Sequence, residues 1–313
     1  MENFMIALNA IVPFLIYLGF GYAARRKGFF DEAFANKLNK VVFQLFFPCL
    51  TFYNIYNASW ETLPSRKLLL ALILSLLLLI VLLCIVVPHF VPVRARAGVV
   101  VQAIFRSNVL LYGLPLTISL FGEEGSAVAA MIVTACITIY NVVAVIVLEW
   151  FGSEKQTSVG ALLRGVCRNP LLQGAVLGLL CFLFHIRFPA SVIKAVSSFS
   201  SMTSPLALFV LGATLHFPSI RKNAKCILAV LGIKMLLLPA FFLAFGLAIG
   251  LRGIELFLLV MAYATPVATS SYPMAQNMGC DGELAGQLVM LSTVISLFTL
   301  FFWIYLMKAM LLF

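Results

Sequence analysis

Two short polar segments interrupt stretches of the sequence that are otherwise apolar. The first runs from Phe105 to Thr117 and the second from Thr265 to Asn277, and both contain proline. Proline lacks a backbone N–H and clashes with the preceding helical turn, so each segment favours a broken helix. A broken helix exposes N–H groups suited to a carboxylate at one new end and carbonyls suited to a cation at the other. The two segments are therefore the candidate ligand site.

Side chains in these segments add hydrogen-bonding groups to the free backbone. The candidate substrate-binding residues are Asn108, Tyr112, Gly113 and Pro115 in the first segment, Asn141 further along the chain, and Thr265, Pro266, Thr269, Ser270, Ser271 and Tyr272 in the second. An isolated Ser or Thr in a membrane helix usually bonds only its own backbone. Two polar breaks in one chain instead indicate a site, and we expect the breaks at Pro115 and Pro266 to lie close together near mid-membrane.

Arg106 and Lys234 are basic residues that fall inside predicted membrane spans. A charged residue at that depth is a candidate for a functional role, here the attraction of an anion. The alternative is that its long side chain extends to the membrane surface, and both interpretations stay open. No Asp or Glu lies near the centre of a predicted span, so the sequence leaves the coupling ion, proton or sodium, undecided.

Patterns typical of enzymes and of metal sites are absent from the sequence. It contains no GxxxxGK[ST] phosphate-binding motif, no HExxH and no CxxC. The three histidines (His89, His185 and His216) fall at the ends of predicted spans, and the seven cysteines are scattered through apolar segments. We therefore expect no catalytic activity, no metal site and no cofactor.

Membrane helices must position the polar segments, because 63% of the 313 residues are hydrophobic and only 10% are charged. A soluble domain has about a quarter charged residues. The apolar pattern predicts an all-α protein with ten spans in the lipid bilayer, at residues 4–24, 38–57, 67–88, 97–121, 126–150, 169–186, 191–215, 226–250, 254–278 and 284–310. The longest connection, around 151–168, is expected to be a loop between the fifth and sixth spans.

The net charge of +10 comes from Lys and Arg in short loops, which is typical of membrane topology rather than of nucleic-acid binding. The loops after odd-numbered spans hold thirteen of the 21 basic residues and those after even-numbered spans hold six. Because basic loops stay in the cytoplasm, both termini are predicted to be non-cytoplasmic, in a multi-pass protein of the cell membrane.

The two halves of the sequence show a repeat with an offset of 157 residues. The matching pairs are Pro13 and Pro170, Pro48 and Pro205, Gly21 and Gly178, Gly122 and Gly279, and Gly125 and Gly282. With five spans per half, the second half enters the membrane in the opposite orientation, which is the pattern of an inverted repeat. We predict repeat units at residues 1–160 and 161–313, with the broken fourth and ninth spans in equivalent positions.

Several motifs of this sequence occur together in a known transporter family. They are Asn108 with Gly113, Pro115 and Leu116, then Arg168-Asn169-Pro170, then Pro205 to Gly212, and finally Pro266 before Ala275 and Gly279. In their order and spacing the chain resembles the auxin efflux carrier family, which includes the plant PIN auxin exporters and bacterial permeases. The resemblance extends over nearly the whole chain, although the long central hydrophilic loop of the plant proteins is absent.

The resemblance implies a fold similar to sodium/proton antiporters and bile-acid symporters, with crossing fourth and ninth helices. Spans one, two, six and seven would form a scaffold and a homodimer interface, and spans three to five and eight to ten would form a moving transport domain. It also implies a small organic anion as substrate, such as auxin or a dicarboxylate, bound at Asn108 and around Pro266. The expected function is alternating-access transport of that anion. The alternative is a membrane sensor that binds at the crossing without transport.

Overall fold

The computed structural model describes residues 2–57, 65–152, 159–215 and 217–313, and all its regular elements within those ranges are helices. The first half of the chain forms α1 (Glu2–Arg26), α2 (Glu32–Val41), α3 (Phe47–Tyr56), α4 (Arg66–Phe90), α5 (Arg94–Phe105) and α6 (Leu114–Gly152). Two π-helical turns, η1 (Val42–Phe46) and η2 (Val109–Gly113), lead directly into α3 and α6. The side chains of Asp31 and Ser65 cap α2 and α4 by accepting backbone N–H bonds.

The second half forms α7 (Val159–Arg168), α8 (Pro170–Leu183), α9 (Ala190–Thr214), α10 (Phe217–Gly232), α11 (Leu238–Ala248), α12 (Gly253–Ala264), α13 (Ser271–Asn277) and α14 (Gly282–Ala309). The π-helical turn η3 (Ile233–Leu237) joins α10 to α11 in one continuous helix. The prediction of a loop over 151–168 is wrong for its second part, where α7 forms. Asn169 then caps α8, whose first residue is Pro170. Proline suits this position because an N–H there would have no acceptor within the helix.

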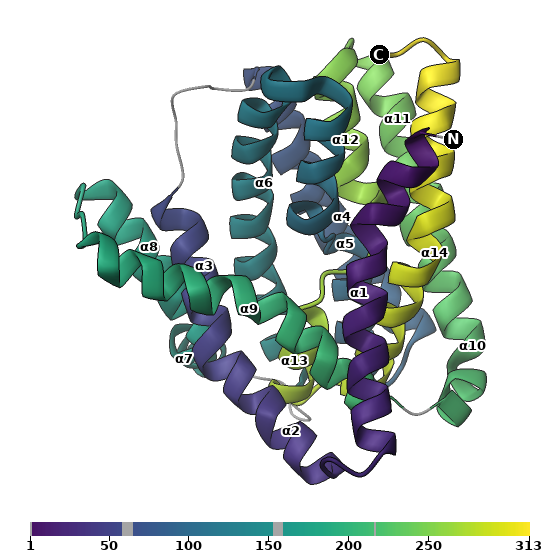
Figure 1. Ribbon diagram of the computed structural model, residues 1–313. Coiled ribbons are helices and arrows are strands. Elements are labelled where there is room, and N and C mark those ends of the chain that lie inside the picture. Colours follow the sequence, from purple (N-terminus) through teal and green to yellow (C-terminus); the bar gives the residue numbers. More distant parts are fainter. Residues whose placement is uncertain (1, 58–64, 153–158, 216) are drawn as a thin grey trace.

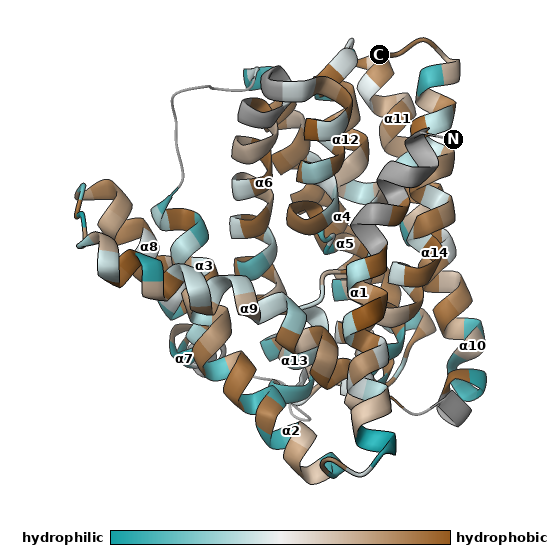
Figure 2. Cartoon of the chain, viewed as in Figure 1, coloured by the Kyte–Doolittle hydropathy of each residue, from teal (hydrophilic) through white to brown (hydrophobic). Residues whose placement is uncertain are grey.

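Five helices in the described ranges are long and apolar enough to cross a membrane, namely Arg66–Phe90, Val128–Gly152, Ala190–Thr214, Ile220–Ala248 and Gly282–Ala309. Shorter apolar helices cover Val109–Gly122, Pro170–Leu183 and Gly253–Ala264. Hydrophobic residues predominate along most of the helices in Figure 2, and α4 exposes a row of leucines that includes Leu70, Leu74 and Leu78. Apolar side chains facing outward along whole helices are what a lipid environment requires.

Gly122 divides the long helix α6. Its backbone lies at φ +64° and ψ −147°, a conformation that glycine adopts without a steric penalty. The helix therefore changes direction here, between an apolar segment that ends at Gly122 and the membrane-length segment that follows. Gly279, which the sequence pairs with Gly122, also has a positive φ, of +75°, in the turn before α14.

Helices α3, α8 and α9 lie on one side of the molecule, and α4, α5, α6, α12 and α14 lie on the other (Figure 1). Close packing of glycine against backbone holds the first group together with α1. A Cβ on Gly21 of α1 would overlap the carbonyl oxygen of Phe209 in α9, and one on Gly178 of α8 would lie 2.8 Å from the carbonyl oxygen of Phe52 in α3. Small residues allow such close approach, and dispersion across the contact stabilises it in lipid.

Candidate functional site

Two helix breaks lie side by side at the centre of the structure. The first is the segment Arg106–Asn108, between α5 and η2, and the second is Thr265–Ser270, between α12 and α13. Ser107 and Val267 form an antiparallel bridge, in which Asn108 N donates to Pro266 O (2.8 Å) and Ala268 N donates to Arg106 O (3.3 Å). The expectation of two adjacent breaks is confirmed, because each segment satisfies backbone groups that the other exposes.

The position of the first break differs from the prediction. Pro115 lies at the second residue of α6, while the break comes at Arg106–Asn108, which contains neither proline nor glycine. Pro115 instead follows the π-helical turn η2 within one continuous helix, Val109–Gly122, and the wider hydrogen-bonding pattern of that turn accommodates the N–H that proline lacks. Pro266, by contrast, does lie in the second break, and its carbonyl forms one of the two bridging bonds.

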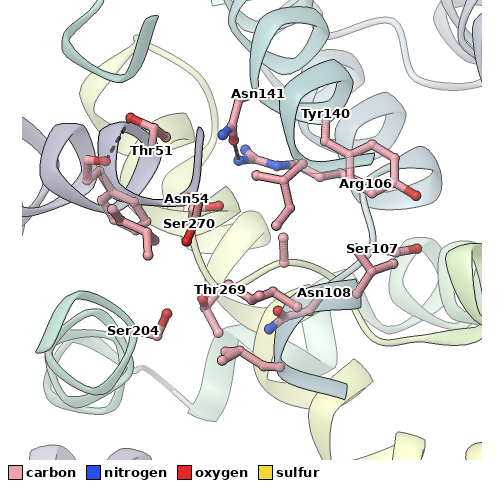
Figure 3. A pocket seen from close by; sticks show the side chains of 17 residues that line it. Thr51, Asn54, Arg106, Ser107, Asn108, Tyr140, Asn141, Ser204, Thr269 and Ser270 are labelled. Carbon is pink, nitrogen blue, oxygen red and sulfur yellow. Dashed lines mark hydrogen bonds between the residues drawn. The ribbon is translucent and has the colours of Figure 1, made fainter. Parts of the chain in front are cut away.

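A polar cavity of about 60 Å³ lies between the breaks and helices α3 and α9. Its walls carry Arg106, Ser107, Asn108, Thr269 and Ser270 from the breaks, Tyr140 and Asn141 from α6, Thr51 and Asn54 from α3, and Ser204 from α9. In Figure 3 the residues of α3 and Ser204 lie on one side and those around Arg106 on the other. Since one water molecule needs about 10–15 Å³ of such a cavity, there is room for about four waters or for a carboxylate group.

Arg106 is buried in the wall of this cavity, with 3% of its surface exposed. Its guanidinium donates to Asn141 Oδ1 (2.6 Å) and to the sulfur of Met274, both of which are neutral. The ion pairs in the described part of the chain are Arg25–Glu32 and Arg96–Asp281, and neither involves Arg106. A buried cation without a counter-ion is costly, and an anion in the cavity would supply the missing partner.

Asn108 adds a free donor next to this cation. Its side chain is 6% exposed, and its Nδ2 has no hydrogen-bond partner among the described residues. Residues 109–111, which begin η2, also line the cavity. The first N–H groups of a helix have no acceptor within it and carry a partial positive charge. The cavity thus combines a guanidinium, an amide N–H₂ and a helix N-terminus, all of which favour an anion.

Lys234 is the second buried basic residue at the crossing. It lies in η3 with no measurable exposure, and its Nζ donates to the hydroxyl of Ser107. Lys234 does not line the cavity, but its partner Ser107 does, so one hydrogen bond connects Lys234 to the cavity wall. Extension to the membrane surface, the alternative for both Arg106 and Lys234, is wrong, because both side chains end inside the protein.

The structure brings five predicted site residues to the cavity, namely Arg106, Asn108, Asn141, Thr269 and Ser270. The others support the crossing from outside the cavity. Tyr112 packs on Phe14 of α1 with ring centroids 5.1 Å apart, and the Tyr272 hydroxyl shares a 2.7 Å hydrogen bond with that of Thr214 at the end of α9. The remaining residues, Gly113, Pro115, Thr265, Pro266 and Ser271, lie in the adjoining backbone of the breaks and of the helices that follow them.

Five polar cavity residues were missed by the sequence reasoning: Thr51, Asn54, Ser107, Tyr140 and Ser204. Thr51 and Asn54 are three residues apart, so they share one face of α3, and this spacing in an otherwise apolar span was a usable signal. Ser107 lies between two residues that were named. Nothing in the local sequence distinguishes Tyr140 or Ser204, since only packing places them here.

Long apolar helices and a buried, cation-bearing polar cavity between two broken helices define a multi-pass membrane transport protein. Comparison with known proteins agrees. Residues 6–304 match the family described as "Membrane transport protein", so the chain belongs to this family, which is the auxin efflux carrier family that the sequence motifs indicated. The family is one of transporters and not of enzymes.

Similar proteins match either most of this chain or about two fifths of it. An "Uncharacterized transporter" of Methanothermobacter thermautotrophicus is 23% identical over 308 residues, covering 96% of this chain and 98% of the relative. The "Uncharacterized transporter YfdV" of Escherichia coli K12 is 22% identical over 277 residues, covering 86% and 88%. The rice "Auxin efflux carrier component 3a" is 30% identical over 140 residues, which cover 43% of this chain and 23% of the rice protein.

Proposed function

We propose that this protein is a secondary transporter of a small organic anion, a carboxylate, which it carries by alternating access at the crossing of the two breaks. The observation that carries the proposal is Arg106, a guanidinium buried in a polar cavity with only neutral partners. Arginine binds a carboxylate through two parallel hydrogen bonds, and in a site shielded from water such a pair is strong. A bound carboxylate would neutralise the buried charge.

The residues that line the cavity then share the binding of the carboxylate. Arg106 pairs with the carboxylate, Asn108 donates its free Nδ2–H, and Asn141 orients the guanidinium through the 2.6 Å bond. Thr269 and Ser270 offer hydroxyl groups from the opposite break. The residues that surround the crossing stabilise the backbone of the two breaks and do not contact the anion. These residues are Tyr112, Gly113, Pro115, Thr265, Pro266, Ser271 and Tyr272.

The proposed mechanism needs a fixed part and a moving part, and the ten-span inverted repeat supplies them. Three contacts support the repeat. Gly21 contacts Phe209 and Gly178 contacts Phe52, and at the 157-residue offset Gly21 corresponds to Gly178 and Phe52 to Phe209. Thr203 donates to the carbonyl of Phe46, its own counterpart at that offset (3.1 Å). Repeat units 1–160 and 161–313 related by a two-fold axis would make these contacts equivalent.

In this arrangement α1, α2–α3, α8 and α9 form the scaffold, and the remaining membrane helices form the transport domain. The cavity lies between the two parts, and its volume of about 60 Å³ is too small for more than a few atoms. A substrate larger than its carboxylate group therefore needs α3 and α9 to separate from the crossing. The scaffold also gives a surface for a homodimer.

The proposed setting is the cell membrane, with both termini non-cytoplasmic. The two ends of the chain lie at the same end of the molecule in Figure 1. The basic turn after α1 and the start of α10, which carry Arg26, Lys27, Arg221 and Lys222, lie at the opposite end, where Figure 2 shows hydrophilic residues. Because basic loops stay preferentially on the cytoplasmic side, this distribution supports the proposed orientation.

Counterflow in proteoliposomes tests the proposed function. Vesicles loaded with an unlabelled carboxylate are diluted into buffer that contains a trace of the same compound in labelled form. The assay is repeated for a panel of mono- and dicarboxylates. A carrier gives transient, saturable accumulation of label above equilibrium. Binding of a carboxylate to the purified protein without any flux would instead indicate a sensor, and the transport proposal would be wrong.

Asn108→Ala is expected to weaken carboxylate binding about tenfold or more. A hydrogen bond to a charged group contributes roughly 1.5–3 kcal/mol, and the alanine variant removes a donor that nothing else in the cavity replaces. Isothermal titration of the purified protein with the best carboxylate measures the loss. The matched control is Asn57→Ala, an exposed asparagine at the end of α3 whose amide donates to the carbonyl of Tyr53. An unchanged affinity in Asn108→Ala would remove Asn108 from the site.

Cross-linking the scaffold to the transport domain is expected to stop transport. Leu211 of α9 lies close to Gly286 of α14, since a Cβ on the glycine would be 2.7 Å from Leu211 Cδ1. The double variant Leu211→Cys/Gly286→Cys, made in a background without the native cysteines, should lose counterflow when treated with Hg²⁺ and regain it with excess thiol. Each single cysteine variant is the control. Full counterflow in the cross-linked protein would show that these helices do not move apart during transport.

A further inference from the structure

The buried lysine of η3 does not line the cavity in which the anion is proposed to bind. Lys234 is completely buried in the continuous helix α10–η3–α11, and its Nζ donates to Ser107 Oγ in the first break. None of the described carboxylates forms an ion pair with it. A lysine in this position is costly when charged, because the ammonium leaves water without gaining a counter-ion.

The elements packed against η3 are α5, α10, α11, α12 and α14. Their titratable and charged residues in or next to the described helices are Arg94, Arg96 and Arg106 of α5 and its C-terminal break, Arg221, Lys222, Lys225 and Cys226 of α10, Arg252, Glu255 and Tyr263 of α12 and its N-cap, and Asp281, Glu283, Tyr305 and Lys308 of α14 and its N-cap, with none in α11. Asp281 is paired with Arg96. Glu255 and Glu283 belong to the first turns of their helices, away from the break. The charge nearest in sequence to Ser107, the partner of Lys234, is thus another cation, Arg106.

The two cations differ in what they can do. Arginine stays protonated at all physiological pH values, whereas a buried lysine gains and loses its proton readily. Arg106 is therefore a permanent charge, and Lys234 can respond to the contents of the cavity. The connection is short, because Ser107 both accepts from Lys234 and lines the cavity wall.

We propose that Lys234 is the proton-coupling group of this transporter. In the empty carrier Lys234 is a neutral amine hydrogen-bonded to Ser107, and Arg106 carries the one positive charge of the crossing. When an anion with two negative charges binds, one charge is balanced by Arg106 and the second by a proton that Lys234 takes up from the side on which the anion enters. The proton leaves with the anion on the opposite side, so that each dianion moves with one proton. This inference rests on the proposed carboxylate transport.

Charge balance explains why the coupled ion is a proton rather than sodium. The guanidinium of Arg106 in the cavity wall would repel Na⁺. A proton on Lys234 instead creates the positive charge that a second carboxylate requires. A monocarboxylate is already balanced by Arg106 and should move without a proton.

The test compares wild type with Lys234→Gln in proteoliposomes, with labelled mono- and dicarboxylates and an imposed pH gradient. In wild type, protons that flow down their gradient are expected to drive accumulation of the dicarboxylate. Uptake of the monocarboxylate should not change with the pH gradient. Lys234→Gln should lose gradient-driven dicarboxylate accumulation but keep monocarboxylate counterflow. Lys194→Gln, an exposed lysine of α9, is the matched control and should behave as wild type.

A second measurement does not depend on the variant. Titration calorimetry of wild type in buffers of different ionisation enthalpy counts protons taken up on binding, and the expected value is about one for a dicarboxylate and about zero for a monocarboxylate. Counterflow that ignores the pH gradient, or gradient-driven accumulation that survives in Lys234→Gln, would overturn the role of Lys234 while leaving the transport proposal intact. Absence of any carboxylate counterflow in wild type would instead overturn the transport proposal, and the coupling with it.

Discussion

Arg106→Met is expected to abolish measurable carboxylate binding and counterflow while leaving the protein folded. Removing one member of a buried, hydrogen-bonded charge pair costs roughly 2–5 kcal/mol, which corresponds to an affinity loss of about 30-fold to several thousand-fold. The substrate carboxylate would enter a desolvated cavity and find only neutral donors. Calorimetric titration and counterflow with the best carboxylate measure the two losses separately.

The stability of the variant separates a binding role from a structural one. In the empty protein Arg106 is a buried charge with neutral partners, so its replacement by a side chain of similar length removes a desolvation cost along with the bond to Asn141. The melting temperature should stay the same or rise. Arg106→Lys should bind the carboxylate more weakly than wild type but better than Arg106→Met, because lysine keeps the charge and loses the planar fork.

Arg252→Gln is the matched control for the loss of one positive charge. Arg252 is exposed and donates to the carbonyls of Leu247 and Leu251 near the end of α11, and the whole of α12 separates it from the second break. We expect binding and counterflow in this variant to equal those of wild type. If Arg106→Met kept its affinity for every carboxylate tested, the guanidinium would not be the anion partner. If the variant failed to fold, Arg106 would be a structural residue.

Gly21→Val is expected to disrupt the scaffold and to cost about 3 kcal/mol of stability or more, at the upper end of what overpacking costs. A Cβ on Gly21 would overlap the carbonyl oxygen of Phe209, and a backbone atom cannot rotate away as a side chain can. Helices α1 and α9 would have to separate along their contact. Thermal unfolding in detergent, followed by tryptophan fluorescence, and the yield of monodisperse protein measure the effect.

The same helix supplies the control. Gly19 is two residues earlier in α1, and a Cβ on it would meet no atom within 4 Å, so Gly19→Val should lower stability only slightly. Under the inverted repeat, Gly178→Val should be damaging for the same reason as Gly21→Val, because it faces the carbonyl of Phe52. Equal stability of Gly21→Val and Gly19→Val would show that the close α1–α9 contact is not needed for the fold.

The amino-acid sequence by itself determined the membrane class, the two polar segments and half of the polar residues that line the cavity. These features are local. Runs of apolar residues need lipid, and polar groups within them need partners, so Arg106, Asn108, Asn141, Thr269 and Ser270 could be recognised from composition and position alone. The family motifs were readable for the same reason, since they lie in the breaks and in close helix contacts.

Only the tertiary structure decided where the first helix breaks and what closes the cavity. The segment Arg106–Asn108 contains no residue that breaks a helix, and its extended backbone is stabilised by hydrogen bonds to Pro266 and Ala268, about 160 residues away in the chain. Pro115, the local signal, lies inside the continuous helix Val109–Gly122, just after the π-helical turn η2. Likewise Thr51, Asn54 and Ser204 reach the cavity because α3 and α9 pack there, and Lys234 meets Ser107 because η3 packs on α5. Contacts between distant segments set these positions, and no local pattern encodes them.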